Sequence, residues 1–131
     1  MDVYAKALFY IDARVRKISM ATEIRIETKE DSIYLEDQNI QALASGQEYL
    51  FALSAVKRIV VLTMDLTPFL DNMCLAVDMG NDTVIFIMSQ HECFKPFLFD
   101  QIGEALPIDY DQVIAAADST EDNVFEIYSR P

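Results

Sequence analysis

Short apolar segments that suit β-strands follow one another from residue 22 to residue 88, and this series most limits the possible folds. In 23-EIRIET-28, Ile24 and Ile26 alternate with charged residues, which is the pattern of a strand with one face in water. Further segments with strand character are 33-IYLED-37, 48-EYLFAL-53 and 57-KRIVVLTM-64. The first half of the chain therefore predicts a series of strands joined by short connections.

The next two segments predict a β-hairpin. The apolar segments 73-MCLAVDM-79 and 83-TVIFIM-88 are separated by Gly80-Asn81-Asp82, which are typical turn residues. Their almost continuous apolar character indicates that both faces of these strands are buried, one of them against a helix.

After residue 88 the apolar spacing changes from strand to helix periodicity. The segment 94-FKPFLFDQIGEAL-106 places its apolar residues on one helical face, and Pro107 ends it. Asp109 followed by Gln112 is a capping pattern that predicts a second helix over 110–117. A final strand is predicted over 123–129. Residues 2–18 predict an N-terminal helix, because one stripe is formed by Tyr4, Leu8, Ile11, Val15 and Ile18.

Successive strands followed by grouped helices are typical of an α+β protein. We expect one domain over residues 1–131, and a chain of this length buries a core without disulfides or metals. The predicted architecture is a curved, mostly antiparallel sheet of about six or seven strands, packed on a C-terminal helix, with an additional N-terminal helix. The predicted parts are an N-terminal helix in 1–20, antiparallel strands in 22–88, helices in 89–117 and the last strand in 123–129.

One short segment, 88-MSQHECFKPFLF-99, brings together the only histidine, an acid and a cysteine. Ser89 and Glu92 have the spacing of a capping box, which predicts a capped turn with His91 facing solvent. The main helix then starts with Pro96 at its first position. His91 and Cys93 are two residues apart, so they point away from each other and make a poor catalytic pair.

The net charge of −12 is unevenly distributed. Residues 1–29 hold six bases and four acids, giving +2, whereas residues 65–126 hold thirteen acids and only Lys95, giving −12. Such a field repels nucleic acid and anionic lipid and attracts a basic protein. No segment approaches the roughly 18 apolar residues of a membrane span, and Asp2 stands where a signal peptide would be basic. We therefore expect a cytoplasmic protein with no nucleic-acid or membrane partner.

Motifs that carry chemistry are missing from the sequence. It contains no nucleophile elbow, P-loop or dinucleotide-binding fingerprint. One histidine and two cysteines without a C-x-x-C spacing do not make a zinc site, and the loop beginning at Asp78 lacks most calcium ligands. The sequence therefore predicts a non-enzyme without cofactor or metal.

Part of the chain resembles a group of small, largely uncharacterised bacterial proteins. The matching segments are 54-SAVKRIVV-61, 68-PFLDNMCLAVD-78 and 113-VIAAADSTEDNVFEIY-128. The resemblance extends over about residues 48–130. It implies a small curved antiparallel sheet related to pleckstrin-homology-like barrels, and it implies no catalytic residues.

The main functional hypothesis is a non-catalytic, acidic module for protein–protein interaction. A more specific version is an immunity or inhibitor protein that covers the basic active site of a toxin. The acids expected to bind the partner lie in turns at the ends of strands: Asp65, Asp71, Asp118, Glu121 and Asp122.

Two alternatives remain open at the level of sequence. The first is a small-ligand-binding protein or small enzyme with an aromatic pocket between helix and sheet. The residues that would line this pocket are Phe94, Phe97, Phe99, Tyr110 and Tyr128. The second alternative is a homodimer formed through an exposed sheet edge or through the apolar stripe of residues 4–18.

Overall fold

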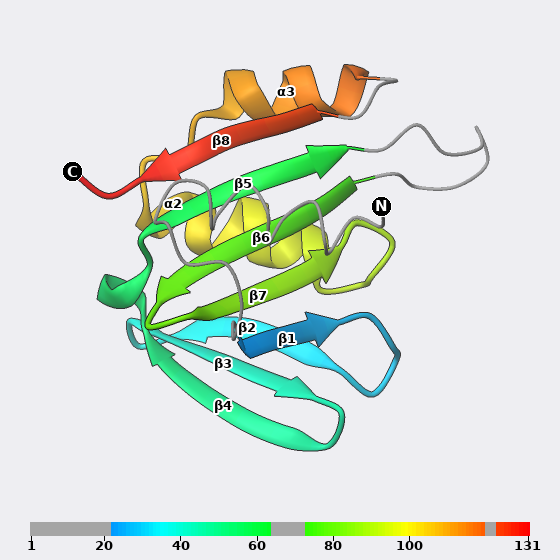
Figure 1. Ribbon diagram of the computed structural model, residues 1–131, viewed down its shortest axis with the longest axis vertical. Helices are drawn as coiled ribbons and strands as arrows, with labels where there is room; N and C mark the ends of the chain where they lie inside the picture. The colour runs from blue at the N-terminus through cyan, green and yellow to red at the C-terminus, as the bar shows by residue number, and fades with distance from the viewer. Residues whose placement is uncertain (1–21, 64–72, 120–122) are drawn as a thin grey trace.

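The structure is a computed structural model that describes residues 22–63, 73–119 and 123–131. Within these residues, eight strands form two sheets (Figure 1). The larger sheet has the order β1-β7-β6-β5-β8: β1 (Thr22–Ile26), β7 (Thr83–Met88), β6 (Met73–Gly80), β5 (Arg58–Thr63) and β8 (Asn123–Ser129). The smaller sheet has the order β2-β3-β4: β2 (Ser32–Glu36), β3 (Asn39–Ala44) and β4 (Gln47–Ala52).

The described residues also form four short helical segments. One follows β4, and the other three lie between β7 and β8. The 3₁₀ turn η1 (Leu53–Ala55) leads from β4 to β5. The π-helical segment η2 (Pro96–Gln101) continues into α2 (Ile102–Ala105), and α3 (Tyr110–Asp118) follows. Pro96 opens η2, as predicted, because the missing proline N–H costs nothing in the first turn. The predicted cap of the next helix is also confirmed: Asp109 Oδ1 accepts a hydrogen bond from the Gln112 N–H at 3.3 Å.

Two tight turns build the smaller sheet. Asp37 and Gln38 join β2 to β3, and Ser45 and Gly46 join β3 to β4; all four have positive φ angles, from 52° to 78°. Such two-residue turns have the twist that antiparallel neighbours need. The side chains then alternate strictly, so that Ile33, Ile40 and Ala42 face the core.

The predicted hairpin over 73–88 is confirmed, and β6 and β7 pair antiparallel on either side of Asn81 and Asp82. The first strand, β1, joins the outer side of β7 in parallel, with Ile24 opposite Ile85. A parallel partner so distant in sequence requires a long crossover, which the smaller sheet and β5–β6 provide.

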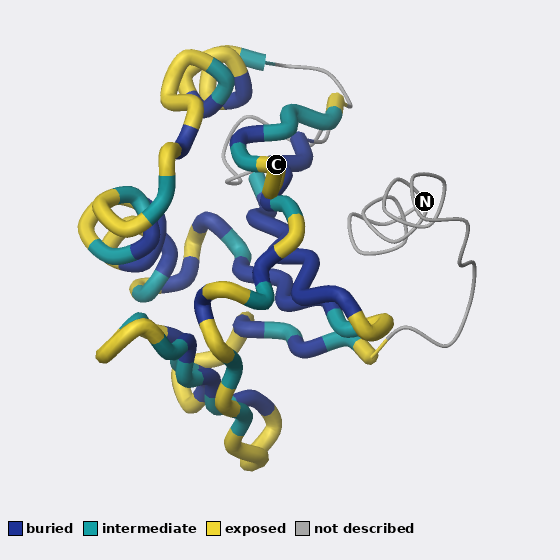
Figure 2. Tube along the Cα trace, turned by 90° about the vertical axis from the view of Figure 1, so that its left-hand side faces the viewer, coloured by how far each residue is buried: buried dark blue, intermediate teal, exposed yellow. Residues whose placement is uncertain are grey.

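The main core lies between one face of the larger sheet, the smaller sheet and the helices (Figure 2). Ile26, Ile40 and Phe97 are fully buried there and come from three different layers. The opposite face of the larger sheet carries a second apolar cluster, whose buried residues are Val60, Leu62, Cys74, Ala76, Val84 and Phe86. The inner strands β5, β6 and β7 are therefore buried on both faces, as the apolar segments of β6 and β7 predicted.

The predicted fold class is wrong. The expected single, mostly antiparallel sheet of about six or seven strands is instead divided into two sheets with eight described strands, and only short helices pack beside them. The strand β3 was not predicted from the sequence. The tight turns before and after it fold residues 32–52 back on themselves as a separate sheet. The N-terminal helix expected in residues 1–20 lies outside the described residues.

Candidate protein-binding surface

The five acids that the sequence suggested for partner binding are not gathered by the described structure. Asp118 is exposed at the last position of α3. The other four, Asp65, Asp71, Glu121 and Asp122, lie outside the described residues. The structure therefore gives a position only for Asp118, which is distant in sequence from the smaller sheet of residues 32–52.

The aromatic residues of the alternative hypothesis separate into two groups. Phe94 and Phe97 are buried in the main core. Phe99 and Tyr110 are exposed and stack on each other, with ring centroids 6.0 Å apart and an interplanar angle of 16°. Tyr128 is partly buried on β8. Because the five rings belong to the core and to the surface, they do not converge on one pocket.

The histidine of the 88–99 segment ties two loops together. His91 is only 9% exposed, so the expectation that it faces solvent is wrong. Its Nδ1 accepts a hydrogen bond from the Cys93 N–H at 3.0 Å, which leaves the ring proton on Nε2. Nε2 then donates to the Thr28 carbonyl at 2.8 Å, across to the loop after β1. Both ring nitrogens of His91 are therefore engaged in hydrogen bonds that stabilise the fold.

The predicted Ser89–Glu92 cap is also wrong. The Ser89 hydroxyl accepts a hydrogen bond from the Met73 N–H at 3.3 Å, and the Ser89 N–H donates to the Met73 carbonyl at 3.0 Å. Ser89 thus extends the pairing of β6 with β7 instead of starting a helix.

The two cysteines are free thiols with different surroundings. Burial raises the pKa of Cys74 to about 12, so its thiolate is scarce at neutral pH. Cys93 is partly exposed. Among residues 22–63, 73–119 and 123–131, no group of three or more His, Cys, Asp or Glu side chains is arranged to hold a metal ion.

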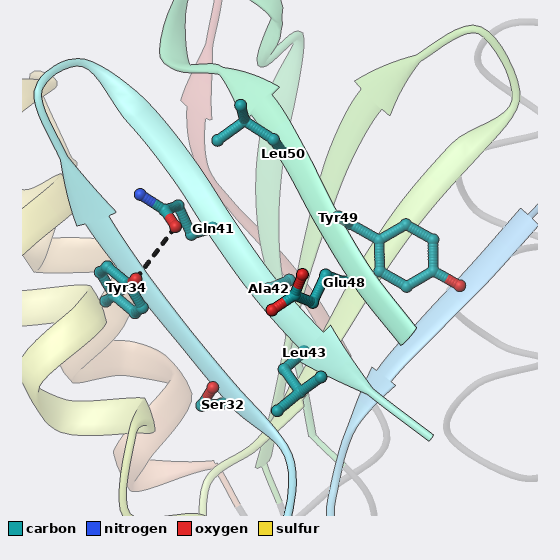
Figure 3. Close-up of a pocket in the computed structure, with 8 residues that line it drawn as sticks. All are labelled: Ser32, Tyr34, Gln41, Ala42, Leu43, Glu48, Tyr49 and Leu50. Atoms are coloured by element: carbon teal, nitrogen blue, oxygen red, sulfur yellow. Dashed lines mark hydrogen bonds between the residues drawn. The ribbon is translucent and has the colours of Figure 1, made fainter. Parts of the chain in front are cut away.

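The outer face of the smaller sheet forms a shallow groove that sequence reasoning did not single out (Figure 3). The groove has a volume of about 390 Å³ and lies across all three strands. Tyr34 and Leu50 are 41% and 65% exposed there, although both are large hydrophobic residues. The register places Gln41 between them, opposite each, and Tyr34 Oη donates to Gln41 Oε1 at 3.0 Å.

The charge around this groove is entirely negative. Glu48 lines it, and Glu36, on the same face of β2 as Tyr34, accepts from Gln41 Nε2 at 3.4 Å. Asp37 follows in the turn, and the sequence has no Lys or Arg from residue 32 to residue 56. The surface thus combines exposed apolar side chains with carboxylates.

A local signal for this surface was present in the sequence. In 39-NIQALA-44 the apolar residues Ile40, Ala42 and Ala44 alternate with Asn39 and Gln41, and Ser45-Gly46 is a turn pair. If β3 had been predicted, its pairing with β2 and β4 would have shown which of their side chains point outward, because side chains alternate between the two faces of a sheet.

Within the part of the chain that the structure describes, no helix has the length and apolar character needed to cross a membrane. Searches with the sequence against protein-family models and curated proteins, and with the fold against solved structures, found no match. The resemblance to small bacterial proteins over about residues 48–130 therefore stays a prediction.

Proposed function

We propose that this chain is a non-catalytic module that binds a basic protein, and that the partner docks on the outer face of β2–β4. The observation that carries the proposal is the exposure of Tyr34 and Leu50 on a face whose charged residues are all acids. Aromatic and aliphatic anchors surrounded by charge are the composition of many protein interfaces.

The more specific form of the proposal is an immunity or inhibitor protein that acts in the cytoplasm on a basic toxin. A net charge of −12 would steer such a partner towards the groove and speed the encounter. In this proposal the acids Asp65, Asp71, Asp118, Glu121 and Asp122 add to the long-range field, while Glu36 and Glu48 make the close contacts.

The test is affinity capture of basic proteins at low and at high salt, with the captured protein then purified and its binding measured. The double variant Glu36→Gln, Glu48→Gln removes two charges beside the groove. The matched control, Glu104→Gln with Asp111→Asn, removes two charges from exposed positions on α2 and α3. Both variants have the same net charge, so they separate a local effect from a global one.

We expect the groove variant to lower the association rate and the affinity by about tenfold at low salt, and the control to change them far less. The difference should shrink at high salt, because ions screen exposed charges. Equal losses in both variants would contradict docking on β2–β4. Failure of the wild-type protein to hold any basic protein at low salt would refute the proposed function itself.

A further inference from the structure

The outer strands of the two sheets differ in how their free edges are protected. On β2, the Leu35 N–H donates to Gln101 Oε1 of η2 at 2.7 Å. On β8, the Ile127 carbonyl accepts from the Asp109 N–H at 2.8 Å. The edge strand β1 carries a charged pair, Glu23 and Arg25, whose side chains are 2.7 Å apart. Covering contacts and charges of this kind are what prevent foreign strands from adding to an edge.

Among the described residues, the edge of β4 has no covering hydrogen bond and no charged pair of this kind. The sheet ends at β4, and the sequence 47-QEYLFA-52 has no proline or lysine and only one charge. Every edge strand presents a row of unpaired N–H and C=O groups, and an edge with few charges and no proline leaves them open to an extended chain nearby.

The turn before β4 determines which of its backbone groups are unpaired. A two-residue turn makes its flanking residues, Ala44 and Gln47, a pair that exchanges both backbone hydrogen bonds. Alternate pairs then repeat this pattern, and the Leu53 N–H continues it by donating to the Gln38 carbonyl at 2.9 Å. Glu48 and Leu50 therefore direct their N–H and C=O groups away from β3, towards the free edge.

The side chains of β4 give the edge two different faces. Glu48 and Leu50 lie on the outer face, beside the groove. Tyr49 and Phe51 lie on the inner face, where they are half-buried and stack with ring centroids 6.3 Å apart. An added strand would therefore meet one carboxylate and a leucine on one side and an aromatic pair on the other.

We propose that β4 is a strand-addition site, at which the basic partner supplies an extended segment of alternating basic and apolar residues. The basic side chains lie on the outer face, with their aliphatic stems on Leu50 and their charges at Glu48. The apolar side chains extend the Tyr49–Phe51 stack. This inference rests on the proposed function and names the form of its partner, a β-strand added to an exposed edge.

Charge decides between this occupant and a second copy of the chain. Two copies would each bring a net charge of −12, and the sequence around β4 offers no base to pair with Glu48. Like charges oppose association, whereas a basic segment gains from the same field.

The experiment uses the full chain and a synthetic peptide of about seven residues, a common strand length, in which Lys and Val alternate. A peptide with Glu in place of Lys is the charge control. Leu50→Pro removes the outward N–H without removing a hydrogen bond to β3, and proline is tolerated on edge strands. Leu50→Thr is the matched variant that keeps the N–H and loses only the apolar side chain. Circular dichroism and thermal unfolding verify that both variants fold.

We expect the wild-type chain to bind the Lys peptide and not the Glu peptide, and Leu50→Pro to weaken binding by about tenfold. Leu50→Thr should weaken binding of the Lys peptide less than Leu50→Pro does. Hydrogen exchange at the Glu48 and Leu50 amides should slow when the peptide is bound, while the amide of Tyr49, already paired with β3, should change little.

Equal binding of the Lys peptide by the wild-type and Leu50→Pro chains would overturn strand addition at β4, as would a lack of binding by the wild-type chain. A dimer in light scattering that becomes a monomer in Leu50→Pro would assign the edge to a second copy and also overturn the proposal. If Leu50→Pro still retains the basic protein but Glu36→Gln, Glu48→Gln does not, the edge proposal fails and the proposed function stands.

Discussion

The ring of His91 is engaged at both nitrogens, by the Cys93 N–H and by the Thr28 carbonyl. It is the only histidine in the chain and lies in the segment for which the sequence predicted a capped turn with His91 facing solvent. Sequence periodicity could not show this role, because Thr28 is 63 residues away. The buried imidazole accepts one hydrogen bond within the turn after β7 and donates one to the loop after β1, and so fastens the two together.

We expect His91→Ala to lower the free energy of unfolding by about 1–3 kcal/mol, since it removes both bonds and leaves their buried partners unsatisfied. Urea unfolding measures this change. Glu92→Ala is the control, because Glu92 is the exposed neighbour and exposed substitutions usually change stability by less than about 0.5 kcal/mol. An unchanged urea midpoint for His91→Ala would contradict the structural role.

Asp31 is a buried carboxylate that organises two turns. Its Oδ2 accepts from the Glu27 and Thr28 N–H groups at 3.0 and 2.8 Å, and its Oδ1 accepts from the Ser45 N–H at 3.1 Å. Burial favours a higher pKa, but the three backbone donors outweigh it and lower the pKa of Asp31 below 3.8.

A lowered pKa means that Asp31 stabilises the fold above its unfolded pKa, near 3.8, and that this contribution disappears as the pH falls through the folded pKa. Asp31→Asn should therefore destabilise the protein by about 1–3 kcal/mol at pH 7, because the amide NH₂ faces a donor. The difference between wild type and variant should shrink below pH 3.8. Urea unfolding at several pH values measures it, and a constant difference would contradict the assignment.

At the scale of elements, local patterns predicted what neighbouring residues determine. The hairpin around Asn81 and Asp82, the Asp109 cap and the helix started by Pro96 are all confirmed, because each depends on residues a few positions apart. The parallel pairing of β1 with β7 depends on residues about 60 positions apart, as Ile24 with Ile85 shows. No local period encodes such a pairing.

The candidate surface was not predicted because the sequence signals for β3 and for the turn before it are weak. In β3 the core positions are Ile40, Ala42 and Ala44, and alanine is a weak strand signal. The turn before it consists of Asp37 and Gln38, which take positive φ angles although neither is glycine. Because β3 was not predicted, β4 had no neighbouring strand from which the exposure of Leu50 could be inferred. The predicted binding residues were therefore acids in turns.

The turn between β3 and β4 offers a test of how far the smaller sheet depends on its backbone geometry. Gly46 has a φ of 78°, and a Cβ added there would meet nothing within 4 Å. Gly46→Ala should therefore cost about 1–2 kcal/mol through the left-handed backbone alone. Gly46→Asn should cost less, because asparagine tolerates this conformation. Thermal or urea unfolding measures both, and equal losses would indicate a steric cause instead.

For the whole molecule, the large negative charge acts on stability as well as on partners. Residues 65–126 alone carry −12, and the described strands and helices of this segment pack around one main core. Repulsion among like charges destabilises a compact state more than an expanded chain. The same field that would attract a basic partner thus weakens the free protein.

We expect the melting temperature to rise as sodium chloride is raised from low to physiological strength, where charges more than about 8 Å apart are largely screened. The gain should be on the order of 1 kcal/mol, the scale of a few exposed charge interactions. Near the sequence pI of about 4.2 the net charge vanishes, and the salt effect should vanish with it. A melting temperature that falls with salt at neutral pH, or rises equally at both pH values, would show that charge repulsion is not the cause. A basic partner should remove the same repulsion, so added salt should raise the melting temperature of the complex less than that of the free protein.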